Sequence, residues 1–144
     1  MTVLTNKVWL DQLQNEGYRI TNPIKVIVDI LSKSERLLNP TEVFLQAKQK
    51  NSNIGLVTVY RTMEKLEKLR LIDRVHMPDG CQSFFKSCNG HQHLLICSTC
   101  GKAEYFEGEN LNQFFQNIGD QFGYLVKDHW LQLFGSCVEC KQSE

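Results

Sequence analysis

The sequence LVTVYRTMEKLEKLRLIDRVHMPDGCQSFFK, residues 56–86, decides the fold of the first half of the chain. Apolar residues recur every three or four positions from Leu56 to Arg70, which is the period of an amphipathic helix. The turn signal Pro78-Asp79-Gly80 then separates two short runs of strand-forming residues, 71–77 and 82–86. The stretch therefore predicts a helix followed directly by a β-hairpin.

Three further helices are predicted before this stretch. Residues 6–15 form the first, with apolar side chains on one face. The pairs Asn22-Pro23 and Asn39-Pro40 open the next two, because Asn is a favoured N-cap and Pro suits the first helical position. Helices followed at once by a β-hairpin are the order of a winged helix-turn-helix domain, in which the hairpin is the wing.

The predicted helix over 56–70 has one face for the core and another that is basic and hydroxyl-bearing. The second face carries Thr58, Arg61, Thr62, Lys65 and Lys68. Arg and Lys neutralise phosphates and reach guanine edges, and Thr can touch a thymine methyl, so this face suits the major groove of DNA. The alternative is an ordinary solvated helix face with an i,i+4 pair between Glu64 and Lys68.

The net charge of zero hides an uneven distribution. Residues 1–86 carry 13 Lys and Arg against 9 Asp and Glu, whereas residues 87–144 carry 3 against 7. The first half is thus +4 and the second −4, which favours nucleic acid as the partner of the first half, with chance as the alternative. No apolar run approaches membrane-spanning length, so we expect no membrane partner.

Two Cys-x-x-Cys pairs dominate the second half: Cys97 with Cys100, and Cys137 with Cys140. Each pair can bind one metal ion through two sulfur atoms, and four thiolates complete a tetrahedral Zn²⁺ site. Such a site has no open position for water or substrate, so we expect structural zinc and no enzyme activity. A zinc hydrolase or thiol redox enzyme would need a three-ligand zinc or a reactive low-pKa thiol.

Disulfides are the main alternative for these cysteines. No signal peptide precedes the chain, so we expect a cytoplasmic protein in a reducing compartment, where disulfides are rare. A thioredoxin-like redox site would show one Cys-x-x-Cys near a βαβ pattern rather than two pairs. Both alternatives are therefore weaker than zinc.

The second half predicts a small α/β unit. Strands are expected at 93–97, 103–106 and 124–134, with an amphipathic helix at 110–122. A unit of about fifty residues seldom holds itself without a metal or a partner. We therefore expect both the zinc and dimerisation through this unit. The fold class is α+β, with a winged-helix DNA-binding domain over 1–86, a hinge over 87–92, and a dimerisation and metal-binding domain over 93–144.

These stretches together resemble the ferric uptake regulator family of metal-dependent bacterial repressors. Gly17-Tyr18-Arg19-Ile20-Thr21 is similar to the family's segment before the second helix, and Thr58-Val59-Tyr60-Arg61-Thr62 to its recognition-helix signature. The motifs around His91-Gln92-His93, Cys97-x-x-Cys100-Gly101, Asp128-His129 and Cys137-x-x-Cys140 follow in family order. The resemblance implies a homodimer that binds double-stranded DNA at an inverted-repeat operator. It also implies DNA contacts by Arg19, Thr58, Tyr60, Arg61 and Lys65.

Within the family, the chain resembles most the zinc uptake regulators. That resemblance implies a regulatory Zn²⁺ at Asp73, Cys88, His91 and His93. One thiolate, two imidazoles and one carboxylate suit zinc, whereas an iron site is more often all nitrogen and oxygen. The expected function is zinc-responsive repression of metal uptake genes. The alternatives are a family member that senses iron, manganese or peroxide, or a sensing site built from His129 with Glu104 or Glu107.

Overall fold

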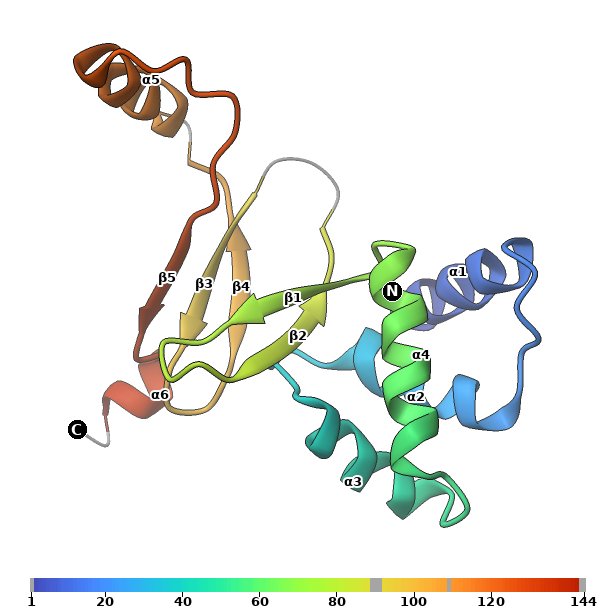
Figure 1. The fold of residues 1–144 in the computed structure, drawn as a ribbon. Helices are drawn as coiled ribbons and strands as arrows, with labels where there is room; N and C mark the ends of the chain where they lie inside the picture. The colour runs from blue at the N-terminus through green and yellow to red at the C-terminus, as the bar shows by residue number, and fades with distance from the viewer. Residues whose placement is uncertain (1, 89–91, 109, 143–144) are drawn as a thin grey trace. The chain divides into compact units, whose positions relative to one another are not determined.

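The structure is a computed structural model that describes residues 2–88, 92–108 and 110–142, with side chains from residue 6 onward. The chain divides into two compact units, Met1–Ser87 and Cys88–Glu144 (Figure 1). In the part of the chain that is described, no helix combines the length and the apolar character that crossing a membrane requires.

The first unit consists of four helices followed by a two-stranded antiparallel hairpin. The elements are α1 (Thr2–Asn15), α2 (Asn22–Lys33), α3 (Pro40–Lys50), α4 (Leu56–Lys68), β1 (Ile72–His76) and β2 (Gln82–Lys86). The hairpin register runs from Ile72 opposite Lys86 to His76 opposite Gln82. The predicted order of helices and wing is confirmed.

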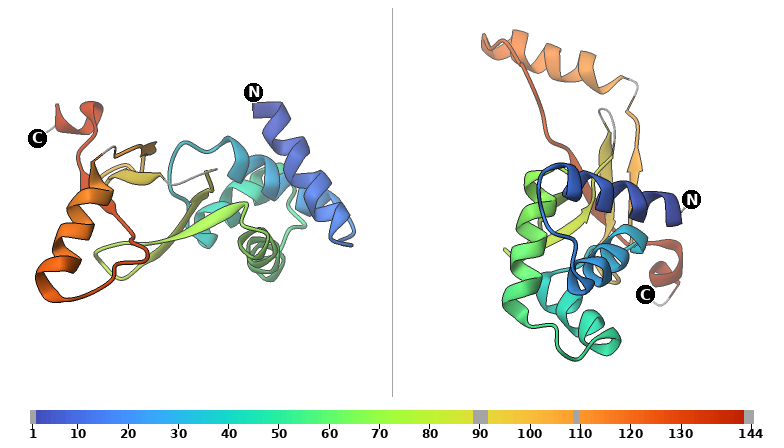
Figure 2. Two further views of the ribbon diagram at one scale, coloured as in Figure 1. Left: turned by 90° about the horizontal axis from the view of Figure 1, so that it is seen from above. Right: turned by 90° about the vertical axis from the view of Figure 1, so that its right-hand side faces the viewer.

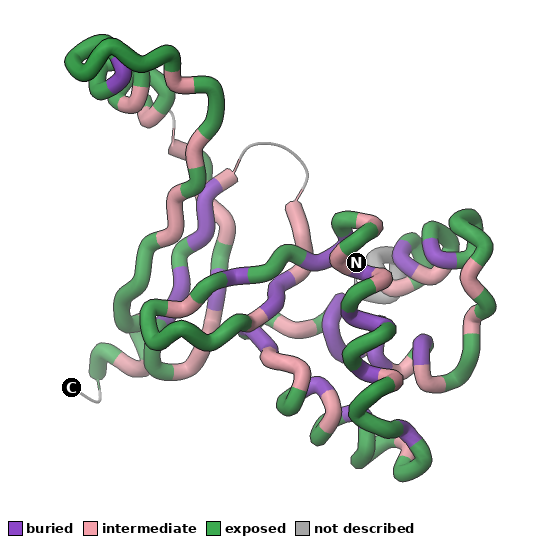
Figure 3. Tube along the Cα trace, viewed as in Figure 1, coloured by how far each residue is buried: buried purple, intermediate pink, exposed green. Residues whose placement is uncertain are grey.

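The core of this unit is apolar and lies among the helices, where Figure 3 shows the buried stretches. Leu13, Ile27, Val43 and Val59 are all fully buried, and each comes from a different helix. The wing is attached to this core through Phe84, which is buried and exchanges two backbone hydrogen bonds with Leu38, at 3.0 and 2.8 Å. The wing is therefore part of the folded unit and not a free hairpin.

Helix starts follow the predicted Asn-Pro pairs, with one correction. The Asn39 side chain caps α3, because its Oδ1 accepts from the Glu42 N–H at 2.8 Å and its Nδ2 donates to the Glu42 carboxylate at 2.9 Å. Helix α2 begins one residue earlier than predicted, since Asn22 is its first helical residue and Thr21 occupies the N-cap. Proline at the next position leaves no donor to satisfy there, so the cap side chain matters less.

Two residues of α4 face the opposite way from the prediction. Leu56 begins the apolar pattern that predicts this helix, so it is expected in the core, but as the first residue of α4 it is 41% exposed. Thr62 was expected among the basic residues but is buried. Its hydroxyl donates to the Thr58 carbonyl at 2.8 Å, which satisfies it within the helix.

The second unit is a three-stranded sheet with one long helix and one short one. Its elements are β3 (His93–Cys97), β4 (Ala103–Phe106), α5 (Leu111–Phe122), β5 (Gln132–Gly135) and α6 (Val138–Lys141). The strand order is β4-β3-β5, with β4 antiparallel and β5 parallel to β3. Helix α5 connects β4 to β5 and lies beyond the end of the sheet rather than against it (Figure 2).

The predicted strand over 124–134 is wrong for most of its length, because only Gln132–Gly135 pairs with the sheet. The residues before it are attached to α5 instead. The Tyr124 N–H donates to the Gly119 carbonyl at 2.7 Å, and the Val126 carbonyl accepts from Gln116 at 3.2 Å. Alternating apolar residues predict a strand only where a neighbouring strand is in reach, and these residues leave α5 at the far end of the sheet.

Candidate metal centre and nucleic-acid interface

The parallel pairing of β3 with β5 brings the two Cys-x-x-Cys motifs together. Cys97 is the last residue of β3 and pairs with Gly135, the last residue of β5. The Ser98 N–H donates to the Gly135 carbonyl at 2.8 Å, which extends the pairing into the first motif. Two residues later Cys137 caps the short helix α6. Motifs forty residues apart thus begin side by side.

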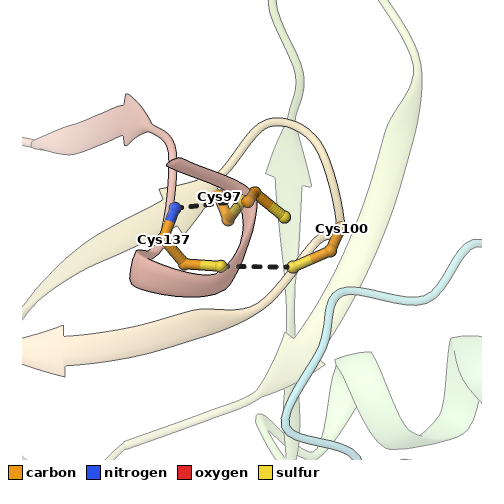
Figure 4. Close-up of side chains that lie close together, drawn as sticks. Cys97, Cys100 and Cys137 are labelled. Carbon is orange, nitrogen blue, oxygen red and sulfur yellow. Dashed lines mark hydrogen bonds between the residues drawn. The ribbon is translucent and has the colours of Figure 1, made fainter. Parts of the chain in front are cut away.

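The four sulfurs form one group, called here the four-cysteine cluster (Cys97, Cys100, Cys137 and Cys140). All four Sγ atoms lie within 4.8 Å of one another, and all four residues are free thiols. The Cys100 and Cys137 sulfurs are 3.8 Å apart (Figure 4). Zn–S bonds of about 2.3 Å in a tetrahedron place the sulfurs roughly 3.8 Å apart, so the spacing fits Zn²⁺.

Hydrogen bonding already prepares one thiol of the cluster for a cation. The Cys137 N–H donates to the Cys97 sulfur at 3.3 Å. Backbone N–H groups of Cys100 and Cys137 lower the pKa of Cys97 to about 6. The Cys137 thiol, together with burial and the two other thiols, raises the pKa of Cys140 to about 12. Metal binding must displace the remaining protons, so the affinity of this cluster for zinc should rise with pH.

The four residues expected to hold a regulatory metal fall in different parts of the chain. Asp73 lies in β1 of the first unit and is exposed. Cys88 and His93 belong to the second unit, where Cys88 is half-buried and His93 is only 4% exposed. His91 lies outside the described residues. A sensing site at these four positions stays a prediction.

Buried His93 has a second histidine beside it. Its ring centroid lies 5.2 Å from that of His129 and 5.5 Å from that of Phe106. His129 also stacks on Phe115 of α5, with ring centroids 4.3 Å apart. The fold thus places His129, a residue of the alternative sensing site, next to His93. Their separation in sequence gave no local signal of this contact.

Helix α4 presents the residues expected to contact DNA, although not all in the same way. Tyr60 is 47% exposed and Arg61 is exposed, while Thr58 is half-buried. Lys65 is also half-buried, because its Nζ lies 5.0 Å above the ring of Tyr18. Arg19, in the loop next to Tyr18, is exposed. Lys65 thus fastens this loop to α4.

Sequence reasoning missed two features of this surface. Val57 is 62% exposed at the start of α4, one turn from Tyr60 and Arg61, so the exposed face is partly apolar. Arg74 of β1 donates from Nε to the Glu67 carboxylate of α4 at 2.8 Å. A contact between a helix and a strand has no periodic signature, so only the fold reveals it.

Comparison with known proteins places the chain among metal-dependent regulators. Residues 15–134 match the model of the ferric uptake regulator family. The ferric uptake regulation protein of Bacillus subtilis strain 168 is 31% identical over 137 residues, which cover 92% of each chain. The structure of a zinc-bound manganese uptake regulator is similar, with a TM-score of 0.75, 25% identity, and coverage of 90% of this chain and 98% of that one. A zinc uptake regulator complexed with zinc and DNA shares the fold, with a TM-score of 0.72 and 14% identity over 99% of this chain and 97% of that one.

Proposed function

The chain belongs to the ferric uptake regulator family, whose members are metal-responsive transcriptional regulators and not enzymes, and we propose that it is a zinc-responsive repressor. Its partner is an inverted-repeat DNA operator that controls metal uptake genes, and its form is a homodimer. A DNA-bound regulator of this kind works in the cytoplasm. The observation that carries the proposal is a half-buried thiol, Cys88, in the same chain as a winged helix with an exposed arginine on its fourth helix, because a thiolate ligand suits zinc better than iron or manganese.

DNA reading is assigned to α4. Its exposed face combines Arg61, which suits guanine or phosphate, with apolar Val57 and the aromatic ring of Tyr60, which suit thymine methyl groups. Thr58 and Arg19 flank this face, and both suit phosphate contacts. Lys65 contributes positive charge while it packs on Tyr18.

The homodimer is supported by the apolar surface of the second unit. Large side chains of α5 and the following segment are exposed to between 40% and 90%: Phe114, Ile118, Phe122, Tyr124, Leu125 and Trp130. Trp130 is 90% exposed, and a monomeric protein rarely exposes so many large apolar side chains along one segment. Strand β5 is an edge of the sheet, and a second copy can pair with its free backbone groups.

The two proposed zinc sites have different roles. The four-cysteine cluster has no open coordination position and fastens the end of the sheet, so its zinc is structural. The regulatory zinc is assigned to Asp73, Cys88, His91 and His93, whose mixed donors favour zinc with weaker retention than four thiolates. Zinc that joins donors of both units would fix the two winged helices at the spacing of the operator half-sites, so metal and DNA would each tighten binding of the other.

Substitution of the regulatory donors tests this assignment. Cys88→Ser and His93→Ala should leave a folded dimer with one zinc per chain but abolish zinc-dependent DNA binding, measured by fluorescence anisotropy. Cys81→Ser, which alters an exposed thiol at the wing turn, is the matched control and should respond to zinc like the parent. If Cys88→Ser or His93→Ala still responds at the parent's zinc concentration, the sensing site lies elsewhere, with His129 as the next residue to replace.

A second candidate function is iron or manganese sensing. It is favoured by the 31% identity to a ferric uptake regulation protein, compared with 14% to the zinc uptake regulator. The thiol of Cys88 separates the two candidates, because a thiolate ligand suits zinc better than iron or manganese. Metal analysis of the protein purified under reducing conditions, with and without Cys88, distinguishes them.

A further inference from the structure

The guanidinium group of Arg74 makes a dense set of contacts between the wing and α4. Its Nε and one terminal nitrogen donate to the two carboxylate oxygens of Glu67, at 2.8 and 2.9 Å. The other terminal nitrogen donates to Gln82 at 2.5 Å. The group also lies over the ring of Phe84, 5.1 Å from its centroid. A planar cation that is bidentate on one side and stacked on the other is held in one orientation.

These contacts join three elements. Glu67 belongs to α4, Arg74 to β1, and both Gln82 and Phe84 to β2. Tyr60, which faces outward from α4, lines the same hollow of about 210 Å³ as Arg74, Glu67 and Phe84. The contacts therefore fix the angle between the wing and the exposed face of α4, next to an aromatic side chain of that face.

We propose that Arg74 and Glu67 form a clamp that positions the wing for DNA binding, so that the wing and α4 reach the same duplex together. The inference rests on the proposed function, because it requires that the wing and α4 bind DNA. It assigns no contact between Arg74 and DNA itself. Arg74 is a positioning residue, and its effect on DNA is exerted through the wing.

Removal of the Glu67 charge distinguishes the clamp from a simple electrostatic role, because the two predict opposite changes in DNA affinity. Glu67 is a negative charge on the helix that faces DNA, so its removal should tighten binding if charge alone matters. Removal should also tighten binding if Glu67 merely withholds Arg74 from a phosphate. The clamp predicts weaker binding instead, because the wing loses its fixed orientation.

Glu64 provides a matched control. It lies three residues before Glu67 on the same helix and is exposed. Among the described residues, the side-chain hydrogen bonds of Arg74 go to Glu67 and Gln82, and Glu64 acts on Arg74 only through its charge. Glu64→Gln and Glu67→Gln thus remove the same charge from the same helix. Only the second also removes one of the two oxygens that accept from Arg74, so only the second disrupts the bidentate clamp.

The test uses the full-length, zinc-loaded protein and a duplex that the parent selects from random double-stranded DNA. Glu67→Gln and Arg74→Lys should each weaken binding roughly fivefold to tenfold, whereas Glu64→Gln should bind as tightly as the parent or more tightly. Hydroxyl-radical footprints of the two clamp variants should lose protection on the wing side and keep it under α4. Both variants should still fold and unfold cooperatively close to the parent's temperature, because a half-exposed ion pair contributes only a small part of the stability of the whole fold.

Tighter binding by Glu67→Gln, similar to that of Glu64→Gln, would overturn the clamp, as would an unchanged footprint. A parent protein that selects no duplex would overturn the proposed function, and that result appears before any variant is measured. The two failures are therefore distinct.

Discussion

At the scale of single residues, we expect each thiol of the four-cysteine cluster to be required for the fold of the second unit. Replacing Cys100 by Ser leaves three thiolates and an incomplete zinc site in a unit of fewer than sixty residues. Cys100→Ser should therefore lose its zinc and lose the dimer or the fold, measured by metal analysis, circular dichroism and sedimentation. Cys81→Ser, whose thiol is exposed on the wing, should retain all three properties. A zinc-free, folded, dimeric Cys100→Ser protein would contradict the structural role.

Arg61 and Lys65 should respond differently to truncation. Arg61→Ala should cost about 1–3 kcal/mol on the selected operator if Arg61 reads a base, and much less on unrelated DNA. Lys65→Ala should weaken binding to all sequences alike. It should also reduce the slope of log binding constant against log salt concentration by about one unit, as expected for one lost phosphate contact. Binding isotherms at several salt concentrations check both. If Arg61→Ala and Tyr60→Ala bind like the parent, α4 does not read DNA.

Residue types and spacing predicted the site whose halves are recognisable motifs by themselves. The two Cys-x-x-Cys motifs indicated one cluster, and the four sulfurs do lie together. The contact of His93 with His129 and the hydrogen bonds of Arg74 depend on pairings between distant segments, which no spacing rule encodes. Thr62 was misplaced because its hydroxyl can bond within the helix, so a polar residue was able to face the core.

At the scale of elements, Gly119 controls how the chain leaves α5. A β-carbon at this position would lie 2.6 Å from the Tyr124 carbonyl oxygen and 2.8 Å from a methyl group of Val126. Gly119→Ala should therefore push the following segment away and destabilise the second unit by about 1–3 kcal/mol, despite the better helix propensity of alanine. Thermal unfolding and dimer dissociation measure this effect.

Gly135 provides the control for this prediction, because a β-carbon there meets nothing within 4 Å. Gly135→Ala should change stability by less than about 0.5 kcal/mol. If both variants behave alike, the close approach of 124–126 to α5 has no energetic role.

The long helices and the hairpin were predictable from periodicity and turn signals, but the segment over 124–126 was not. Its alternation indicated a strand that the position of α5 puts out of reach.

At the scale of the whole molecule, the binding of metal and the binding of DNA must be reciprocal. If the regulatory zinc tightens operator binding by some factor, the operator must tighten binding of that zinc by the same factor. Zinc titrations with and without the selected duplex measure one side, and DNA titrations with and without the second zinc measure the other. Unequal factors would mean that another process, such as a change of oligomeric state, contributes to the response.

The most direct test of the central claim is a DNA-binding titration of protein that contains one zinc per chain, under anaerobic conditions. Addition of a second equivalent of Zn²⁺ should tighten binding of the selected duplex at least about tenfold in the parent and leave Cys88→Ser unchanged. Most protein sites bind Zn²⁺ more tightly than Mn²⁺ or Fe²⁺. If added Zn²⁺ does not change DNA binding, low affinity of the site for Zn²⁺ is therefore not the explanation. A chain that responds to Fe²⁺ or Mn²⁺ but not to the second Zn²⁺ would contradict a zinc-responsive repressor.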